Sequence, residues 1–387
     1  GVGGGPLDGG PPDADADAGP DADVSPEDPC GFGPTDDPDE DRVVLVAQPF
    51  SPDPEVPGTE IRSLILGADG RIADTGTRLD LGSRPGLIAV TPSGRFAIVA
   101  GEDGTVTLVE IRAPDDLLIR DVVGLPPLGP ADLVMHPDGH TAFVVQHNVD
   151  ESSGVFTLTL GCDGTLTAAA SHFGLRLAEA MALVPGDPDQ AVLLGGQTAF
   201  EPIDDDDVRL LVRDGDTWRQ GAAFDVFHDF VGADGLAIHP AGQLVAIPNN
   251  SLFSEETGQV ALLALDGAGG LQEVQRVLDL PDPALVRFSP DGSALAVLRP
   301  EAGRVTLLAR QGADFGVAGE LRVGVASGMA FVERGESAGL LVVPGVPAEG
   351  EARVQVYRVE DGQGRLVDEA PLGRGFPNVP TTLGLRP

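Results

Sequence analysis

A short pattern recurs along this chain, and its last copy is divided between the two ends of the sequence. The pattern is an apolar run, a Pro-x-Gly turn and a second apolar run, as in residues 87–90, Pro92-Ser93-Gly94 and residues 96–99. The chain stops at Pro387, where another such turn would begin, and the apolar run that would complete that copy lies at residues 42–47. A repeat divided in this way predicts a closed ring in which strands from both ends share one sheet.

Each copy is expected to form a strand, a tight turn and a strand, because proline presets φ for a turn and glycine accepts a positive φ. A third apolar run and a weaker fourth one follow, for example at residues 105–109 and 117–119. Two further copies are degenerate, and the full set of turn positions is Pro92, Pro137, Pro185, Pro240, Pro290, Glu333 and Pro387. These positions are about 43–55 residues apart, a period typical of one propeller blade.

The pattern therefore predicts an all-β, seven-bladed β-propeller with four-stranded antiparallel blades, closed by pairing of the C-terminal strand with the N-terminal blade. A β-sandwich with chance turns is the alternative, but it does not account for the divided copy. Over residues 42–387 the repeated phrase resembles that of the seven-bladed propellers related to 6-phosphogluconolactonase and of the surface-layer repeat propellers. The resemblance implies the fold and leaves the activity open, because this superfamily includes both lactonases and surface proteins that are not enzymes.

Residues 1–41 differ from the rest in composition. They carry thirteen Asp or Glu residues, no arginine and almost no large apolar side chain, so they cannot bury enough surface to offset the entropy of ordering. We therefore expect a flexible acidic tail over 1–41 and the propeller over 42–387. The tail is similar to the tether of a processed bacterial lipoprotein. By that analogy we expect an exported protein that is periplasmic, tethered to the outer membrane through a lipid anchor ahead of Gly1, or extracellular.

The charge of the chain restricts its partners. The formal net charge is −37, and arginine supplies every one of the 24 basic residues. Such a balance disfavours nucleic acid and anionic membrane surfaces, whereas cations and basic partners remain compatible with it. No apolar run of about 18 residues occurs, so no transmembrane helix is predicted.

The two cysteines are placed so that they could pair. Cys30 lies in the tail, and Cys162 lies in a Gly-Cys-Asp-Gly turn expected between the third and fourth strands of one blade. The residues between Cys30 and Arg42 could span roughly 35–40 Å when extended. In an exported protein a Cys30–Cys162 disulfide would attach the tail to the ring; two unpaired thiols are the alternative.

The loops are distributed unequally between the two faces of the ring. The 1–2 and 3–4 turns of each blade lie on one face, termed the turn face, and the 2–3 loops and blade-to-blade linkers lie on the other, termed the linker face. Long 2–3 loops are expected at residues 48–59, 146–153, 195–207 and 248–258. Long loops on a rigid scaffold favour binding at the linker face, and neutral drift of surface loops is the alternative.

These long loops are acidic. The candidate binding residues in them are Glu201, Asp204, Asp205, Asp206, Asp207, Glu255 and Glu256. Ca²⁺ takes six to eight oxygen ligands, so Asp204 and Asp206 are the first candidates for holding it. A solvated acidic loop without an ion is the alternative, and no other cofactor is predicted.

The linkers should bring polar residues to the central mouth of the ring. These residues are Arg84, Asp132, Arg176, Glu179, His228, Asp229, Asp234, Asp282, Arg374 and Asn378. If the lactonase activity in the superfamily applies, His228 would act as a base or orienting group, and Arg84 and Arg176 would hold the substrate anion. A linker histidine bound by backbone carbonyls is the alternative for His228. His136 and His239 occupy the position of Thr91 and Ser289 in other copies, so we expect them to cap turns.

The sequence contains no Gly-x-Ser-x-Gly nucleophile elbow, no phosphate-binding glycine loop and no metalloprotease motif. We therefore expect an exported binding or scaffold module that engages a protein partner or a component of the cell envelope through its long-loop face. The alternative is a lactonase-like hydrolase working at the central mouth. A third hypothesis is that the acidic loops bind Ca²⁺ and so become ordered for a partner.

Overall fold

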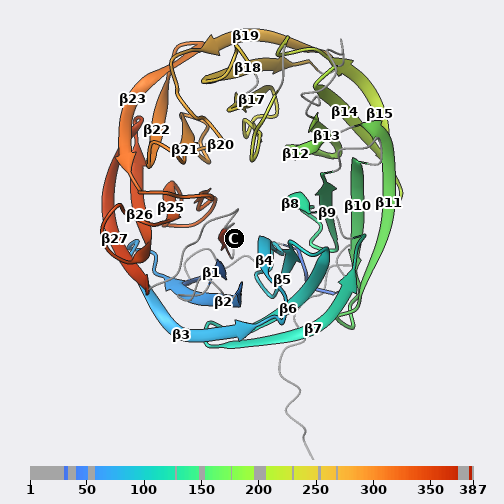
Figure 1. Ribbon diagram of the computed structural model, residues 1–387, viewed down its shortest axis with the longest axis vertical. Coiled ribbons are helices and arrows are strands. Elements are labelled where there is room, and N and C mark those ends of the chain that lie inside the picture. The colour runs from blue at the N-terminus through green and yellow to red at the C-terminus, as the bar shows by residue number, and fades with distance from the viewer. Residues whose placement is uncertain are drawn as a thin grey trace, which may run out of the picture.

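The computed structural model describes residues 30–33, 41–50, 57–126, 129–147, 153–175, 177–195, 206–228, 231–251, 254–266, 269–373 and 383–385. All regular structure in these ranges is β-strand, arranged in seven four-stranded antiparallel sheets. The sheets stand as blades around a central axis, with β4, β8 and β12 close to the axis and β7, β11 and β15 at the periphery (Figure 1). The predicted seven-bladed propeller is thus confirmed. No segment within the described ranges forms a helix that could cross a membrane.

Each blade runs from an innermost strand at the axis to an outermost strand at the periphery. In that order, blade 1 contains β28 (Leu383–Leu385), β1 (Arg42–Phe50), β2 (Pro57–Leu66) and β3 (Ile72–Asp80). Blade 2 contains β4 (Pro85–Val90), β5 (Phe96–Gly101), β6 (Thr105–Ala113) and β7 (Asp116–Gly124). Blade 3 contains β8 (Pro130–Met135), β9 (Thr141–Gln146), β10 (Ser153–Leu160) and β11 (Leu166–Leu175). Blade 4 contains β12 (Ala178–Val184), β13 (Asp187–Gly195), β14 (Val208–Asp214) and β15 (Thr217–Phe224).

The remaining three blades repeat this order. Blade 5 contains β16 (Ala237–Ile238), β17 (Leu244–Asn249), β18 (Gln259–Leu265) and β19 (Leu271–Val277). Blade 6 contains β20 (Leu285–Phe288), β21 (Ala294–Arg299), β22 (Arg304–Gln311) and β23 (Asp314–Arg322). Blade 7 contains β24 (Ala330–Phe331), β25 (Leu340–Gly345), β26 (Ala352–Glu360) and β27 (Gln363–Gly373).

The turns between first and second strands follow from their sequences. Gly94 has φ +69° and Gly292 also has φ +69°, a conformation that glycine adopts without steric cost. The carbonyl of the residue before the proline accepts a hydrogen bond from the backbone N–H of the turn glycine. At His136 and His239 the ring Nδ1 accepts the N–H of the residue two positions later, at 3.1 Å in both cases. The predicted turn-capping role of these two histidines is therefore confirmed.

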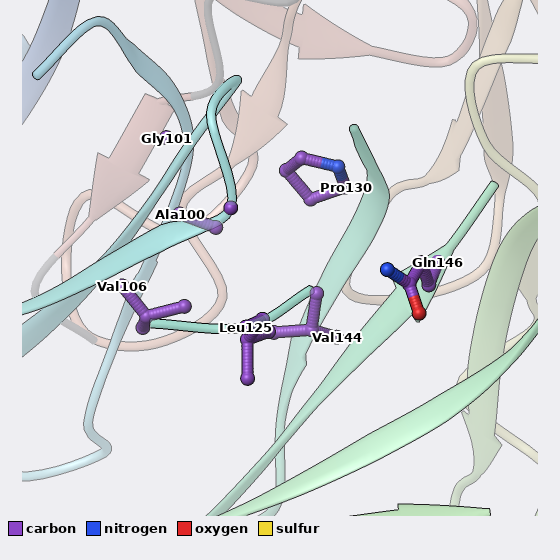
Figure 2. A pocket seen from close by; sticks show the side chains of 8 residues that line it. Ala100, Gly101, Val106, Leu125, Pro130, Val144 and Gln146 are labelled. Carbon is purple, nitrogen blue, oxygen red and sulfur yellow. The ribbon is translucent and has the colours of Figure 1, made fainter. Parts of the chain in front are cut away.

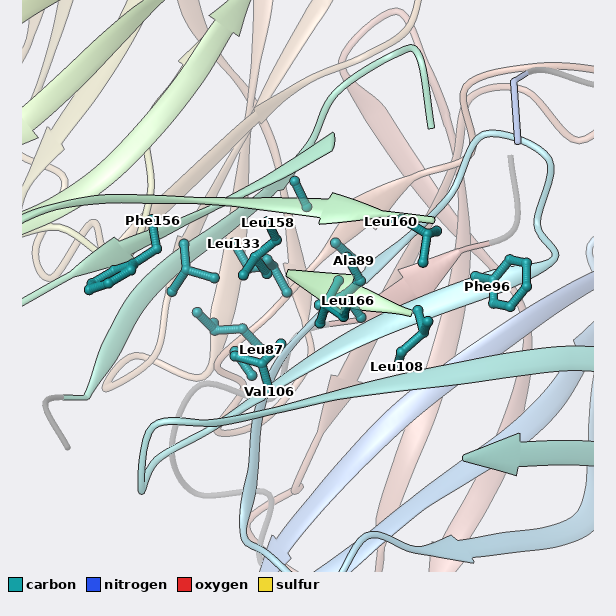
Figure 3. Packing of buried hydrophobic residues seen from close by; sticks show 14 of the residues in the cluster. Leu87, Ala89, Phe96, Val106, Leu108, Leu133, Phe156, Leu158, Leu160 and Leu166 are labelled. Atoms are coloured by element: carbon teal, nitrogen blue, oxygen red, sulfur yellow. The ribbon is translucent and has the colours of Figure 1, made fainter. Parts of the chain in front are cut away.

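A layer of buried apolar side chains fills each interface between neighbouring blades. Figure 3 shows the layer between blades 2 and 3, where Leu108 of β6 lies among Leu158 and Leu166 of β10 and β11. Among the described residues the core consists of seven such clusters, one for each interface of the ring. The middle strands of a blade are packed on both faces, which explains why all six residues of β5 are buried.

Polar side chains on the outer strands also join neighbouring blades. In four places a side chain of one outer strand accepts the backbone N–H near the start of the next outer strand. The pairs are Asp368 with Ile72, Asp121 with Leu166, Ser171 with Trp218 and Gln275 with Phe315, at 2.8–3.0 Å. These bonds hold neighbouring blades in register at the periphery of four of the seven interfaces.

Blade 1 contains strands from both ends of the chain. β28 pairs antiparallel with β1, with Val44 opposite Leu385, Leu45 opposite Gly384 and Val46 opposite Leu383. The first strand of this blade is therefore the C-terminal strand, while its other three strands are N-terminal. The interface between blades 1 and 7 carries an apolar cluster like the other six.

Residues 30–33, termed the docked segment, lie against the turn face although they belong to the stretch expected to be a flexible tail. Cys30 and Cys162 form a disulfide with their Cα atoms 5.0 Å apart, so the pairing expected for an exported protein is present. Phe32 is 1% exposed and packs against Phe96 and His140, with ring centroids 5.1 and 4.8 Å away. The other residues of that stretch, apart from Asp41, lie outside the described part of the chain.

Candidate functional site

Four carboxylates and one arginine gather around the ring axis. Asp132 lies on β8, Glu179 on β12 and Arg287 on β20, while Asp234 and Asp282 lie in the linkers that lead into β16 and β20. The first strands of the blades stand closest to the axis (Figure 1), so they carry these side chains to the centre. The five residues are termed the central cluster. Its four carboxylates are among the mouth residues predicted from the sequence.

Backbone donors fix two of these carboxylates. Asp132 accepts the N–H of Leu133 at 2.8 Å and that of Met181 in the next blade at 3.0 Å. Glu179 accepts the N–H of Ala233, the residue before Asp234, at 2.9 Å. Each carboxylate thus forms a hydrogen bond from the first strand of its own blade to the chain that leads into or forms the next blade. Both side chains therefore join neighbouring blades at the centre of the ring.

Glu179 and Asp234 titrate close to neutral pH. Burial raises the pKa of Glu179 to about 7, and the neighbouring charge of Asp234 adds to this effect against the opposing bond from Ala233. Burial, together with the charge of Asp282, raises the pKa of Asp234 to about 6. Asp234 remains exposed to solvent although protein surrounds it. A pair of adjacent carboxyls with separated pKa values near 7 is a feature of acid–base sites.

Asp132 and Arg287 face one another across the centre. They belong to blades 3 and 6, yet the charge of each stabilises the ionised form of the other. Burial still dominates both groups: it raises the pKa of Asp132 and lowers the pKa of Arg287. Arg287 donates from Nη1 to the carbonyls of Leu236 (3.3 Å) and Val286 (2.9 Å).

Strained backbone lies next to the central cluster. Leu177, two residues before Glu179, has φ +50°, and Asp279 and Asp282 have φ +60° and +59°. Residues other than glycine rarely adopt a positive φ. This backbone conformation costs about 1–3 kcal/mol per residue, and such residues are concentrated at functional sites. Three of the four such residues in the described ranges thus precede first strands that carry the central cluster.

His228 does not join the central cluster. Its side chain is 82% exposed, and its Nδ1 lies 3.4 Å from Asp225 Oδ2. Its backbone N–H donates to Glu256 Oε2 at 2.7 Å. These contacts place it at the linker between blades 4 and 5.

Arg84 is engaged by other groups. Its Nη1 lies 2.7 Å from Glu102 Oε2, and its Nε donates to the carbonyl of Pro49 at 3.1 Å. Arg84 belongs to the linker between blades 1 and 2, whereas His228 belongs to the linker between blades 4 and 5. The catalytic roles expected for His228, Arg84 and Arg176 therefore stay predictions. Arg176, Asp229, Arg374 and Asn378 lie outside the described residues.

The acidic loop residues have different surroundings. Asp207 is fully buried and accepts the N–H groups of Val226 and Phe227, both at 2.9 Å, so it anchors a linker instead of facing a ligand. Glu256 pairs with Arg276 at 2.9 Å. Asp206 is half-buried and Glu255 is exposed, while Glu201, Asp204 and Asp205 lie outside the described residues. Across the described ranges, no three His, Cys, Asp or Glu side chains are placed to hold a metal ion.

Hollows of very different size also lie away from the axis. Figure 2 shows one between blades 2 and 3, lined by Val106, Leu125, Val144 and Gln146, with a volume of about 10 Å³. This is room for about one water molecule. A wider hollow of about 350 Å³ on blade 7 is lined by Glu351, Arg353, Glu369 and Pro371. There Arg353 is paired with Glu369 at 2.7 Å.

Sequence reasoning missed Arg287 because it considered the linkers and not the first strands. The missed signal is a charged residue inside the short apolar run Leu285-Val286-Arg287-Phe288. A strand at the centre of a propeller is surrounded by protein, so a charge there is costly unless it has a role.

Solved structures with the same fold cover nearly all of the ring. A protein from Lactobacillus plantarum is 13% identical with a TM-score of 0.69, and the match covers 89% of this chain and 99% of that one. The periplasmic gluconolactonase PpgL of Pseudomonas aeruginosa is 16% identical (TM-score 0.66; 89% and 99% covered). A candidate 6-phosphogluconolactonase of Bacteroides uniformis is 15% identical (TM-score 0.64; 89% and 99% covered). No protein-family model and no curated protein sequence matches the chain. The similarity establishes the propeller fold, which by itself hosts many activities.

Proposed function

We propose that the protein is a lactone hydrolase whose reaction takes place at the central cluster. The observation that carries this proposal is the pair Glu179 and Asp234, two adjacent carboxyls with pKa values of about 7 and about 6. Such a pair can supply a base and an acid at the same neutral pH. Two structures with the same fold bear gluconolactonase names, which is consistent with this chemistry.

The roles follow from the two pKa values. Asp234 has the lower value and is exposed to solvent, so it is the base that takes a proton from the attacking water. The water oxygen bonds to the lactone carbonyl carbon, and Arg287 stabilises the oxyanion that develops there. Glu179 has the higher value and is the acid that protonates the ring oxygen as the ester C–O bond breaks. The product is a hydroxy acid, and the carboxylates around it repel its new charge and favour release.

The test is a pH-stat assay of the purified protein against a panel of sugar and aliphatic lactones. We expect kcat/KM to follow a bell-shaped pH profile with limbs near 6 and 7, which are macroscopic values of the coupled pair. Asp234→Asn and Glu179→Gln should each lower kcat by about 100-fold or more, since general acid–base catalysis contributes about 10²–10⁴-fold. Both variants are close to isosteric, so their melting temperatures should stay near that of the wild type.

Glu349→Gln is the matched control, because Glu349 is exposed and lies on blade 7 after β25. It should leave the rate unchanged. A flat trace across the whole panel, or full activity in both central variants, would contradict the proposal.

A binding module at the linker face is the second candidate function. The docked segment lies against the turn face at blades 2 and 3, so we assign partner binding to the opposite face, where the long 2–3 loops are predicted. We expect a pull-down from the cell-envelope fraction to retain a partner that a variant with shortened loops 196–205 and 252–253 does not retain. Equal recovery by both proteins would exclude these loops.

A further inference from the structure

Residues 232–235, termed the junction segment, lead into β16 of blade 5 and are also bonded to the two neighbouring blades. The N–H of Ala233 donates to Glu179 of blade 4 at 2.9 Å. The N–H of Asp234 donates to the carbonyl of Ala284, in the linker into blade 6, at 2.7 Å. The positions of the base Asp234 and the acid Glu179 relative to one another therefore depend on one short stretch of backbone.

The two ends of the junction segment are glycines that lie close to neighbouring chain. A Cβ added at Gly235 would lie 2.4 Å from Leu285 Cδ1, and Gly235 also pairs with Leu285 as a parallel bridge. A Cβ added at Gly232 would lie 2.9 Å from Asn250 Oδ1 and 3.3 Å from the backbone N of Ser251. Neither glycine has a positive φ, so it is the close packing that leaves little room for a side chain.

Asn249, the last residue of β17, holds the Gly232 end of the junction segment. Asn249 has no exposed surface. Its Oδ1 accepts the N–H of Gly232 at 3.2 Å and that of Ser251 at 3.0 Å, while its Nδ2 donates to Ser254 Oγ at 3.3 Å. The carbonyl of Gly232 accepts the N–H of Asn250 at 2.9 Å. One buried amide thus links the junction segment to the 2–3 loop of blade 5.

The same place in two other blades carries a side chain that also reaches the preceding linker. Gln146 at the end of β9 donates to the carbonyl of Pro126 at 3.3 Å. Arg299 at the end of β21 donates to the carbonyl of Pro281 at 2.8 Å. The linker that Asn249 holds carries the base of the proposed reaction, whereas the linker that Gln146 holds carries neither of the two groups that transfer protons.

We infer that Asn249 is a positioning residue, which fixes the placement of Asp234 and Glu179 through the backbone of the junction segment. This inference rests on the proposed function. Among the described residues, the charged groups next to the pair are Asp282, whose charge acts on Asp234, and Arg287, whose guanidinium lies beside the last glycine of the segment. Asn249 is uncharged, so its removal leaves these charges in place.

The experiment measures kcat, KM and the pH profile of Asn249→Ala with a lactone that the wild type hydrolyses. The variant releases Gly232 and so loosens Ala233, whose N–H lowers the pKa of Glu179 against the effect of burial. Weakening this bond should raise the pKa of Glu179, and the alkaline limb of the profile should move up by about 0.5–1 pH unit. We expect kcat to fall by about 10–100-fold and KM to change by less than about threefold, because Asn249 acts through the pair and not on the substrate.

Gly232→Ala tests the same contact from the other side and keeps the buried amide. Its new methyl group would push the junction segment away from Asn250 and Ser251. Both kcat and the alkaline limb should therefore change in the same direction as in Asn249→Ala. This variant decides the question if Asn249→Ala does not fold.

Each variant has a matched control. Gln146→Ala removes the corresponding bond to the linker of blade 3, so it should lower the melting temperature and leave kcat and the pH profile unchanged. Gly124→Ala adds a Cβ that meets nothing within 4 Å, so it should change none of these quantities.

The outcomes separate this inference from the proposed function. A wild type that hydrolyses no lactone of the panel would overturn the proposed function and the inference with it. An active wild type whose folded Asn249→Ala variant keeps kcat and the alkaline limb would overturn the inference alone, as would an unchanged profile in Gly232→Ala. Equal changes in Asn249→Ala and Gln146→Ala would trace the effect to general loosening of the ring and would overturn it too.

Discussion

At the scale of single residues, neighbours in the sequence have opposite surroundings in this fold. Asp206 is half-buried, whereas Asp207 has no exposed surface and accepts two backbone N–H groups. Burial is the main reason that the pKa of Asp207 is raised to about 7, and the nearby charge of Asp225 adds to it. A run of four aspartates therefore contains one residue with a structural role.

This environment makes stability depend on pH. Because the pKa of Asp207 is higher in the folded than in the unfolded state, the folded protein binds this proton more tightly, and stability falls as pH rises from about 4 to 7. One such proton changes the unfolding free energy by about 1.4 kcal/mol per pH unit. Asp207→Asn should be less stable than the wild type at pH 5, but it should lose less stability between pH 5 and pH 8.

Urea unfolding at the two pH values measures this difference, with Asp206→Asn as the control that keeps the wild-type dependence. An equal loss of stability in wild type and Asp207→Asn would show that Asp207 does not titrate in this range.

Residue roles were predictable where the repeat supplied a comparison. His136 and His239 could be assigned to turns because Thr91 and Ser289 occupy the same position in other copies. The repeat supplied no such comparison for Asp207 or Arg287. Burial of Asp207 depends on a linker almost twenty residues away, and the setting of Arg287 depends on a carboxylate three blades distant.

At the scale of elements, the docked segment behaves as an added piece of the turn face. The carbonyl of Phe32 accepts the N–H of Ser93 at 3.1 Å, and Arg95 donates to the carbonyl of Cys30 at 3.3 Å. A Cβ added at Gly139 would lie 2.2 Å from the oxygen of Phe32. The absence of a side chain at Gly139 is therefore what allows the segment to approach blade 3.

Gly139→Ala should displace the docked segment. Gly139 and Gly312 have the same φ of +71°, but a Cβ at Gly312 would meet nothing within 4 Å. Gly312→Ala should cost about 1 kcal/mol for the backbone alone, and Gly139→Ala should cost about 2–4 kcal/mol because the contact with Phe32 is also lost. Chemical denaturation compares the two variants. Equal losses would indicate that the segment is not seated at Gly139.

The disulfide should stabilise the ring measurably. It joins residues separated by 132 positions, and a cross-link over a long loop contributes about 2–4 kcal/mol. The double variant Cys30→Ser/Cys162→Ser should unfold at lower denaturant concentration by this amount. A thiol count on unreduced, denatured wild-type protein should find none free. Two reactive thiols would contradict the pairing.

The elements themselves were largely predictable, because strands and turns leave a local signature. The apolar runs around Pro92 and Pro290 correspond to β4, β5, β20 and β21. The seating of Phe32 left no such signature. One phenylalanine in an acidic, glycine-rich stretch has no periodic neighbours, and its burial depends on a notch formed by blades 2 and 3.

At the scale of the whole molecule, the ring is a closed series of seven similar interfaces. Blade 1 is the only one whose strands come from both chain ends among the described sheets. Three residue pairs join β28 to β1. Without them, β1 would be an edge strand with unpaired backbone groups.

Removing residues 383–387 should open this edge. We expect a loss of about 2–3 kcal/mol, since each hydrogen bond contributes about 1 kcal/mol, and self-association through the exposed strand. Unfolding and light scattering measure the two effects. A shortened chain that stays monomeric with unchanged stability would show that β28 is dispensable for closure.

The global fold could be predicted from the sequence more completely than the site. The fold follows from a pattern repeated along the chain, so each copy supports the others. The central cluster collects one or two residues from blades 3, 4, 5 and 6, and only the assembled ring brings them together. The carboxylates could be named from the linkers, but their pKa values depend on the surrounding protein.

The disulfide also has a mechanical consequence. A pull on the N-terminal stretch would reach the ring at Cys30 and pass through the covalent bond to Cys162 in blade 3. Residues 31–41 would then carry little tension, and β1 would not be drawn away from β28. The pairing between β28 and β1, three residue pairs long, is thereby shielded from load applied at that end of the chain.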